Sequence, residues 1–328
     1  MSDKRRFYIT IPLPVLGAAI LFMLLTGALN LQAQVTTLPI EFNNNHIFIK
    51  AGTGKSDSLR FVFDSGATNM SIDSAAADKA GVSMENCERV QVGGHGGARF
   101  YLMAKDQTFR VGGVNLEHVN PVLVDFSSMT RATGMKLDGL IGYELLNAYV
   151  TKIDFEQKEL SLYNNIKEID TSGYTGIPFE FNKGVLIPRF PVTITLPDGE
   201  QFTGRVMFDS GGFFTLLVSI GYNKFHGLSQ KLPNRTLQKM QGLNTTNTEE
   251  RAAIKGMQFD GFELGEMPID LTMNDKAEAS EGYLGMIGIE IIRKFNVILD
   301  YADKKIYLKP NKMYKVPFTQ DPEITKDK

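Results

Sequence analysis

Two copies of the tripeptide Asp-Ser-Gly supply the residues of this chain that are best suited to chemistry. An apolar run at residues 61–63 leads into Asp64, and a second run at 206–208 leads into Asp209. Two carboxylates held together in a partly desolvated cleft share one proton, because both cannot ionise cheaply. The ionised partner can take a proton from water while the protonated partner donates to a carbonyl oxygen. The pair therefore predicts acid–base hydrolysis that requires no metal and no cofactor.

The serine and the glycine after each aspartate have supporting roles in this interpretation. Ser65 and Ser210 carry hydroxyls that can lock the two turns through hydrogen bonds to the backbone. Gly66 and Gly211 let the main chain pass close to the carboxylates and offer N–H donors. Phenylalanines of the preceding strands are expected to form apolar walls of the cleft. A single Asp-Ser-Gly turn is an ordinary way to start a loop, so the interpretation depends on the second copy.

The two copies belong to an internal repeat. Asp64 and Asp209 lie 145 residues apart, and the segment 140–146 matches 286–292 at an offset of 146. Matching apolar segments then end in Asp154 and Asp300, which we interpret as the first residues of turns. Ordered matches over about 100 residues predict a duplication. Pseudo-twofold packing of the two lobes would set one tripeptide beside the other.

Short strands must position the two aspartates. The segments 47–50 and 59–63 predict a hairpin, and the segments 190–196 and 202–208 repeat it. The 31 glycines fall mostly between such runs, which favours an all-β fold, and the repeat predicts two duplicated lobes. Short helices are expected at 74–80, 143–148 and 290–294. The expected divisions are a first lobe at 35–165, a linker at 166–176, a second lobe at 177–318 and a polar tail at 319–328.

The amino terminus has the composition of an export signal. Basic residues at 4–6 precede a nearly charge-free stretch from 7 to 31, and small residues predict cleavage after Ala33. An uncleaved membrane anchor at 1–33 is the alternative, because the apolar stretch reaches the ~20 residues that a span needs. Either interpretation predicts an exported protein that is periplasmic or associated with the cell envelope.

Composition and charge exclude several classes of function. A formal net charge of -2 and a pI near 6.1 give no basic surface for nucleic acid. Cys87 is the only cysteine, so no intrachain disulfide is possible, and the four histidines lack a zinc-binding spacing. Membrane contact is expected only through the amino-terminal segment if it is uncleaved. The chain is expected to act as a monomer.

Three motifs of this chain resemble those of bacterial exported aspartic proteases of the pepsin and retropepsin type. They are Asp-Ser-Gly-Ala-Thr at 64–68, a glycine-rich stretch at 92–97 and Asp-Gly-Leu-Ile-Gly at 138–142. The resemblance covers both lobes, roughly residues 35 to 309. It implies a bilobal β fold with two duplicated, barrel-like lobes and a central cleft. It also implies hydrolysis of a protein or peptide substrate by an Asp64 and Asp209 dyad, and a β-hairpin flap that closes over an extended peptide.

The remaining candidate residues surround the two tripeptides. Thr68 is expected in the supporting shell, and Gly94, His95 and Gly96 are expected in the flap, although a mobile surface loop is the alternative for this segment. The second lobe lacks the small hydroxyl residue after its tripeptide, so Phe213 either lines a substrate pocket or fills the core. This departure leaves open a different class of protein, a catalytically inactive pseudo-protease that binds peptides in the cell envelope.

Overall fold

The computed structural model of the chain describes residues 34–94, 97–182, 184–242, 246–273 and 278–318. The expected signal or anchor at 1–33 and the expected tail at 319–328 lie outside the described residues. Among the helices that are described, none combines the length and the apolar character needed to cross a bilayer.

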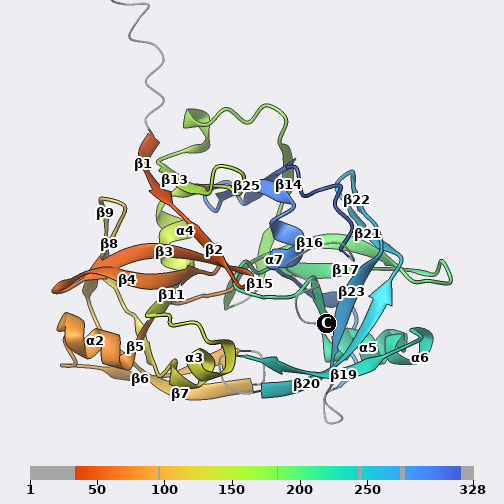
Figure 1. Cartoon of the computed structure of the whole chain (residues 1–328), viewed down its shortest axis with the longest axis horizontal. Coiled ribbons are helices and arrows are strands. Elements are labelled where there is room, and N and C mark those ends of the chain that lie inside the picture. Colours follow the sequence, from red (N-terminus) through yellow and green to blue (C-terminus); the bar gives the residue numbers. More distant parts are fainter. Residues whose placement is uncertain (1–33, 95–96, 183, 243–245, 274–277, 319–328) are drawn as a thin grey trace, which may run out of the picture. The chain divides into compact units, whose positions relative to one another are not determined.

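A ten-stranded sheet forms the framework of the first half of the chain (Figure 1). Its strands are β2 (Glu41–Asn43), β3 (His46–Thr53), β4 (Ser56–Phe63), β5 (Ser71–Asp73), β6 (Glu88–Gly94), β7 (Gly97–Met103), β8 (Gln107–Val111), β9 (Val114–Val119), β10 (Val122–Val124) and β11 (Gly139–Ile141). They follow the order β6-β7-β10-β5-β11-β4-β3-β8-β9, with β2 beside β3. The predicted hairpin before the first tripeptide is the β3–β4 pair.

A second ten-stranded sheet repeats the first. Its strands are β15 (Glu180–Asn182), β16 (Val185–Thr195), β17 (Gln201–Phe208), β18 (Leu216–Val218), β19 (Thr236–Gln241), β20 (Thr246–Ile254), β21 (Gly256–Phe259), β22 (Phe262–Leu264), β23 (Met267–Thr272) and β24 (Tyr283–Ile287). The order β19-β20-β23-β18-β24-β17-β16-β21-β22, with β15 beside β16, matches the first sheet position by position. The predicted all-β duplicated fold is confirmed.

A six-stranded sheet joins the two halves, and the sequence did not predict it. Its strands are β1 (Gln34–Pro39), β12 (Val150–Asp154), β13 (Glu159–Tyr163), β14 (Thr175–Pro178), β25 (Phe295–Asp300) and β26 (Lys305–Pro310), in the order β1-β13-β12-β25-β26-β14. The central pair is β12 and β25, one from each half, where Ile153 lies opposite Val297. Both side chains are fully buried. The two halves are therefore tied together by backbone hydrogen bonds as well as by apolar packing.

Helices are short and fill the corners between strands. They are α2 (Ser74–Ala80), α3 (Ser127–Thr133), α4 (Tyr143–Ala148), the 3₁₀ turn η1 (Ile166–Glu168), α5 (Ile220–His226), α6 (Leu228–Lys231) and α7 (Ile289–Ile292). The predictions for α2 and α4 are confirmed, and α7 is shorter than expected. Helix α5 was missed, although Ser219 caps its first turn and Gly227 ends it with a φ of 64°.

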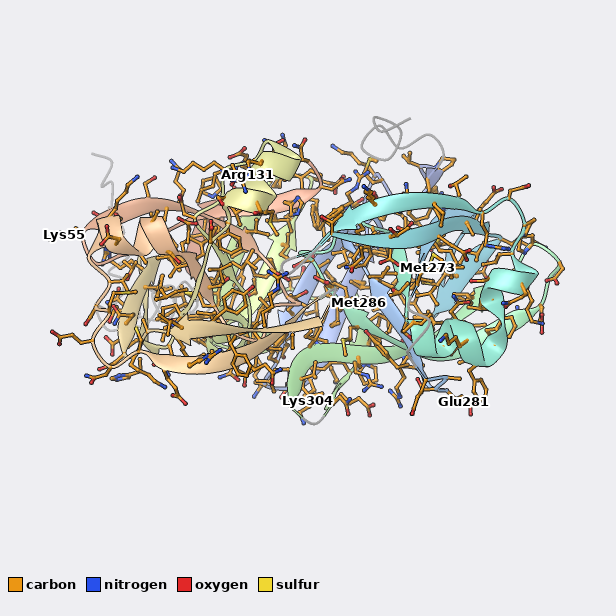
Figure 2. All side chains as sticks on the ribbon, turned by 90° about the horizontal axis from the view of Figure 1, so that it is seen from below. Lys55, Arg131, Met273, Glu281, Met286 and Lys304 are labelled. Atoms are coloured by element: carbon orange, nitrogen blue, oxygen red, sulfur yellow. The ribbon has the colours of Figure 1, made fainter. Side chains whose placement is uncertain are left out.

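Figure 2 shows how the side chains distribute over the two halves. Lys55 and Arg131 lie on the side of the first sheet, Met273 and Glu281 on that of the second, and Met286 lies nearer the boundary between them. One large cluster of buried apolar side chains contains residues of both ten-stranded sheets and of the shared six-stranded sheet. The core is therefore continuous through the repeat.

Replacing Ile153 by alanine is expected to lower the free energy of unfolding by about 2–5 kcal/mol, because it opens a void opposite Val297 in the shared sheet. Urea denaturation measures this change. Glu159, exposed on the same sheet, provides the control: Glu159→Ala should change the free energy of unfolding by less than about 0.5 kcal/mol. Similar losses in both variants would contradict the packing role.

Candidate active site

Asp64 and Asp209 lie just past the carboxyl ends of equivalent strands. Strand β4 pairs with β11, and β17 pairs with β24, in parallel in both cases. The Asp64 N–H donates to the carbonyl of Ile141 at 2.9 Å, and the Asp209 N–H donates to that of Ile287 at 3.0 Å. Each tripeptide is therefore held by the segment that the repeat marks as its partner.

Two glycines allow the partner segments to pack directly behind the tripeptides. A β-carbon on Gly142 would lie 2.1 Å from the carbonyl oxygen of Asp64, and one on Gly288 would lie 2.2 Å from that of Phe214. Real β-carbons do not approach backbone atoms so closely. A side chain at either position would push the adjacent turn out of place.

Ser65 and Ser210 join the two tripeptides through four hydrogen bonds. The Ser65 hydroxyl donates to the carbonyl of Phe208 at 2.8 Å and accepts from the Ser210 N–H at 3.0 Å. The Ser210 hydroxyl donates to the carbonyl of Phe63 at 3.1 Å and accepts from the Ser65 N–H at 2.9 Å. The sequence predicted hydroxyl-to-backbone bonds at these turns. Each hydroxyl in fact reaches the opposite turn, and both serines are buried.

The carboxyl groups of Asp64 and Asp209 are hydrogen-bonded to each other. The Gly66 N–H donates to Asp64 Oδ1 at 2.8 Å, and the Gly211 N–H donates to Asp209 Oδ1 at 3.0 Å. A β-carbon on Gly66 would lie 2.6 Å from Asp209 Oδ1, and one on Gly211 would lie 2.3 Å from Asp64 Cγ. Each glycine therefore makes room for the carboxyl group of the opposite half.

The two carboxyl groups differ in their affinity for a proton. Burial raises the pKa of Asp209, and the negative charge of Asp64 raises it further, to well above its ordinary value. Burial also raises the pKa of Asp64, but backbone N–H groups of Gly66, Ala67 and Gly211 offset part of this effect. The coupled pair thus holds one proton most readily on Asp209 and the negative charge on Asp64.

The two aspartates line a cavity of about 710 Å³ that is formed by both halves. Its walls are mostly apolar, and within the described residues no lysine, arginine or glutamate is among the lining residues. The same described part of the chain has no cluster of three or more His, Cys, Asp or Glu that could hold a metal ion. The apolar side chains in the walls include Phe48, Val62, Val124, Met135, Leu137, Ile187, Phe213, Leu217 and Met286.

The structure brings most of the predicted site residues to this cavity. Thr68, Gly94 and Phe213 line it together with the two aspartates, whereas His95 and Gly96 lie outside the described residues. The prediction that phenylalanines of the preceding strands form the walls was wrong. The hydrophobic core instead contains Phe61, Phe63 and Phe208. Side chains alternate along a strand, so the opposite face of β4, with Val62, meets the cavity.

Sequence reasoning missed several residues of the cavity, among them His46 and Tyr283. Burial raises the pKa of Tyr283, and the negative charge of the nearby Asp209 raises it further. The Tyr283 hydroxyl donates to Met207 Sδ at 3.5 Å. The only sequence signal was the position of Tyr283 three residues before the repeated segment 286–292. His46 has no motif around it apart from the three asparagines before it.

Two repeated all-β halves that each bring an Asp-Ser-Gly turn to one shared cavity define an aspartic protease type of architecture. Residues 50–145 match the model of a family described as aspartyl protease. The matched segment begins in β3 and ends in α4, and it contains Asp64 and the segment packed behind it. No curated protein matches the chain. The family match supports a hydrolase of the aspartyl protease type in general terms.

Ser65→Ala and Ser210→Ala are each expected to lower the free energy of unfolding by about 2–4 kcal/mol, because each leaves buried backbone groups without partners. The double variant should lose less than the sum, since both changes break one network. Urea denaturation of all three variants tests this, with Ser58→Ala, exposed on β4, as control. Additive losses would contradict a shared network.

Proposed function

We propose that this chain is an aspartic endopeptidase in which Asp64 and Asp209 together activate one water molecule. The observation that carries the proposal is the mutual hydrogen bond of two carboxyl groups with unequally raised pKa values at a cavity formed by both halves. General acid–base hydrolysis needs this combination of one charged and one protonated carboxyl group.

In the proposed reaction, the Asp64 carboxylate takes a proton from water as the water oxygen bonds to the carbonyl carbon of the peptide. The protonated Asp209 donates its proton to the carbonyl oxygen, which gives a neutral tetrahedral diol. The diol then loses a proton to Asp209, and Asp64 donates its acquired proton to the leaving nitrogen as the carbon–nitrogen bond breaks. Both carboxyl groups return to their starting states, and no covalent enzyme intermediate forms.

Substrate binding is proposed to use the apolar walls and the two hairpins that reach the cavity. Strand β6 contributes residues 91–94 and strand β19 contributes Met240. A flap role for the β6–β7 hairpin, with Gly94, His95 and Gly96 near its tip, stays a prediction from the sequence. The proposed partner is a protein or peptide in extended conformation, with no nucleic acid.

The proposed location is outside the cytoplasm, in the periplasm or at the cell envelope. This proposal depends on the composition of residues 1–33 as a signal or anchor. The joining of both halves through the six-stranded sheet supports a site formed within one chain, and hence a monomer.

The alternative of an inactive peptide-binding protein depended on the altered residues after the second tripeptide. The Asp209 carboxyl group nevertheless accepts a hydrogen bond from the Gly211 N–H at 3.0 Å. This bond corresponds to the one that the Asp64 carboxyl group accepts from the Gly66 N–H at 2.8 Å. The altered side chains therefore leave the proposed proton-donating carboxyl group with its backbone partners, which favours the enzyme.

Asp64→Asn and Asp209→Asn are each expected to reduce the rate of peptide cleavage by at least about 10²–10⁴-fold, because either change removes one of the two proton-transfer groups. Hydrolysis of a denatured protein from about pH 3 to pH 8 measures this, and kcat/KM should fall at both ends of the range. Asp154→Asn, in a turn far from the dyad in sequence, is the control. Cleavage that survives in either dyad variant would exclude the proposed mechanism.

The stability of the Asp209→Asn variant relative to that of the wild type is expected to increase as the pH rises. Because the pKa of Asp209 is raised in the folded protein, its carboxyl group stabilises the folded state below about pH 4. This stabilisation is lost as the pH rises through the raised pKa. Asparagine cannot ionise, so the Tm of the variant relative to wild type should increase by about 2 °C or more between pH 4 and pH 7. Calorimetry measures this, and a pH-independent difference would contradict the raised pKa.

A further inference from the structure

His46 enters the cavity from a rigid turn. It begins β3 directly after Asn44 and Asn45, whose φ values of 46° and 57° are those of a tight two-residue hairpin. Asn43 pairs with His46 across this turn. The turn is held to the second half by Asn45 Nδ2, which donates to Glu290 Oε1 at 3.4 Å. His46 is 9% exposed and lines the cavity.

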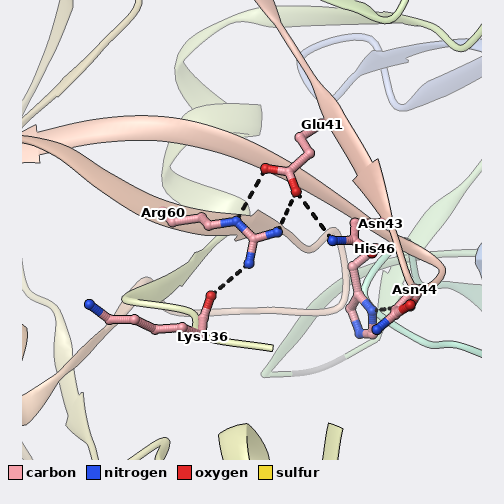
Figure 3. Close-up of polar contacts among 6 residues, drawn as sticks. All are labelled: Glu41, Asn43, Asn44, His46, Arg60 and Lys136. Carbon is pink, nitrogen blue, oxygen red and sulfur yellow. Dashed lines mark hydrogen bonds and ion pairs between the residues drawn. The ribbon is translucent and has the colours of Figure 1, made fainter. Parts of the chain in front are cut away.

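The hydrogen bond of the imidazole determines which ring nitrogen carries the proton. His46 Nδ1 lies 2.6 Å from the carbonyl oxygen of Asn44, as Figure 3 shows. A carbonyl oxygen can only accept, so Nδ1 is the donor. Burial lowers the pKa of His46, and the positive charge of Arg60 lowers it further. The ring is therefore neutral near pH 7, and its Nε2 has a lone pair available to accept a hydrogen bond.

The charged groups near this ring are already engaged with each other. Arg60 donates to Glu41 at 2.7 Å and to the carbonyl of Lys136 at 2.7 Å (Figure 3), and its guanidinium lies 3.4 Å from the centre of the Phe48 ring. Among the described residues, the only hydrogen bond of the His46 ring is the one to Asn44. Within this part of the chain, no protein group therefore occupies the acceptor at Nε2.

Aromatic rings from both halves flank the imidazole. Its centroid lies 6.1 Å from that of Phe48 and 5.8 Å from that of Phe213, with interplanar angles of 41° and 40°. The acceptor nitrogen thus belongs to a wall that is otherwise apolar. A peptide side chain that reaches this wall either pairs with the nitrogen or leaves it unsatisfied.

The second half has no such acceptor at the equivalent place. Val185 begins β16 as His46 begins β3, and it pairs with Asn182 as His46 pairs with Asn43. Val185 also lines the cavity. These two positions of the cavity wall are therefore related by the repeat but differ in chemistry, with a neutral acceptor at one and an aliphatic side chain at the other.

We propose that His46 is a specificity-determining residue whose Nε2 accepts a hydrogen bond from a neutral donor side chain of the bound peptide, a hydroxyl or a carboxamide. This inference rests on the proposed peptidase function. An aliphatic side chain would leave the acceptor unpaired, and a carboxylate would set its lone pairs against those of the nitrogen. The site should prefer threonine or serine over valine, alanine, aspartate and glutamate at one position of the peptide.

The test is a set of peptides built around one cleaved sequence, in which each position in turn carries threonine or valine. These two side chains have nearly the same shape and differ in the hydroxyl. In the wild-type protein, kcat/KM at one position should be about fivefold higher for threonine. His46→Val should bring this ratio close to 1, and His46→Gln, whose amide oxygen can accept, should restore part of it. Val185→His should leave the ratio at that position unchanged.

Each outcome decides the inference. A threonine-to-valine ratio near 1 at every position, or a ratio that His46→Val leaves intact, overturns it. A loss of activity in His46→Val by the same factor for every peptide indicates a general structural role and also overturns it. A thermal unfolding curve checks that each variant is folded, and the folded His46→Gln variant keeps the test valid if His46→Val is not folded.

Binding separates this inference from the endopeptidase proposal. The same peptides, labelled with a fluorophore, are titrated with wild type and with His46→Val, and anisotropy gives Kd. Cleavage without threonine preference would overturn the inference alone. Threonine-selective binding that His46→Val abolishes, without cleavage in the wild type, would overturn the endopeptidase proposal alone. Absence of both cleavage and binding would overturn both.

Discussion

The hydrogen bonds exchanged by Ser65 and Ser210 are the constraint on which the rest of the site depends. Two carboxyl groups brought together away from water repel each other when both ionise and lose hydration energy. The serine network opposes this by pairing the buried backbone groups of one turn with the hydroxyl of the other, at 2.8 to 3.1 Å. Separating the turns would take the partners from four backbone groups and two buried hydroxyls, so the carboxyl groups stay in contact.

The carboxyl groups of Asp64 and Asp209 differ in pKa although the backbone around them is nearly symmetric. The Gly66 N–H donates to Asp64 Oδ1 just as the Gly211 N–H donates to Asp209 Oδ1. Burial raises the pKa of both carboxyl groups, and the negative charge of Asp64 raises that of Asp209 further. The coupling between the two charges therefore separates the proposed acid from the proposed base.

Local patterns in the sequence predicted the parts of the fold that repeat, and missed the parts that depend on contacts between the halves. The tripeptides, their hairpins and the segments ending in Gly142 and Gly288 are contiguous and occur twice, so their pairing could be inferred. The shared sheet could not, because the β12–β25 pairing joins segments about 145 residues apart that carry no signal for each other. Strand β4 is buried on both faces, which hid the fact that Val62 rather than Phe61 meets the cavity.

Phe213 shows how duplication within one chain allows the two halves to diverge. The sequence indicated a lost hydroxyl next to the second tripeptide, yet Asp209 keeps its backbone donors and the phenylalanine ring instead packs beside His46 of the other half. Two identical halves would have to present the same side chain at both ends of the cavity. With one gene encoding both, His46 and Val185 can differ while the tripeptides stay alike. An asymmetric cavity can then distinguish the direction of a bound peptide, which a twofold-symmetric cavity cannot.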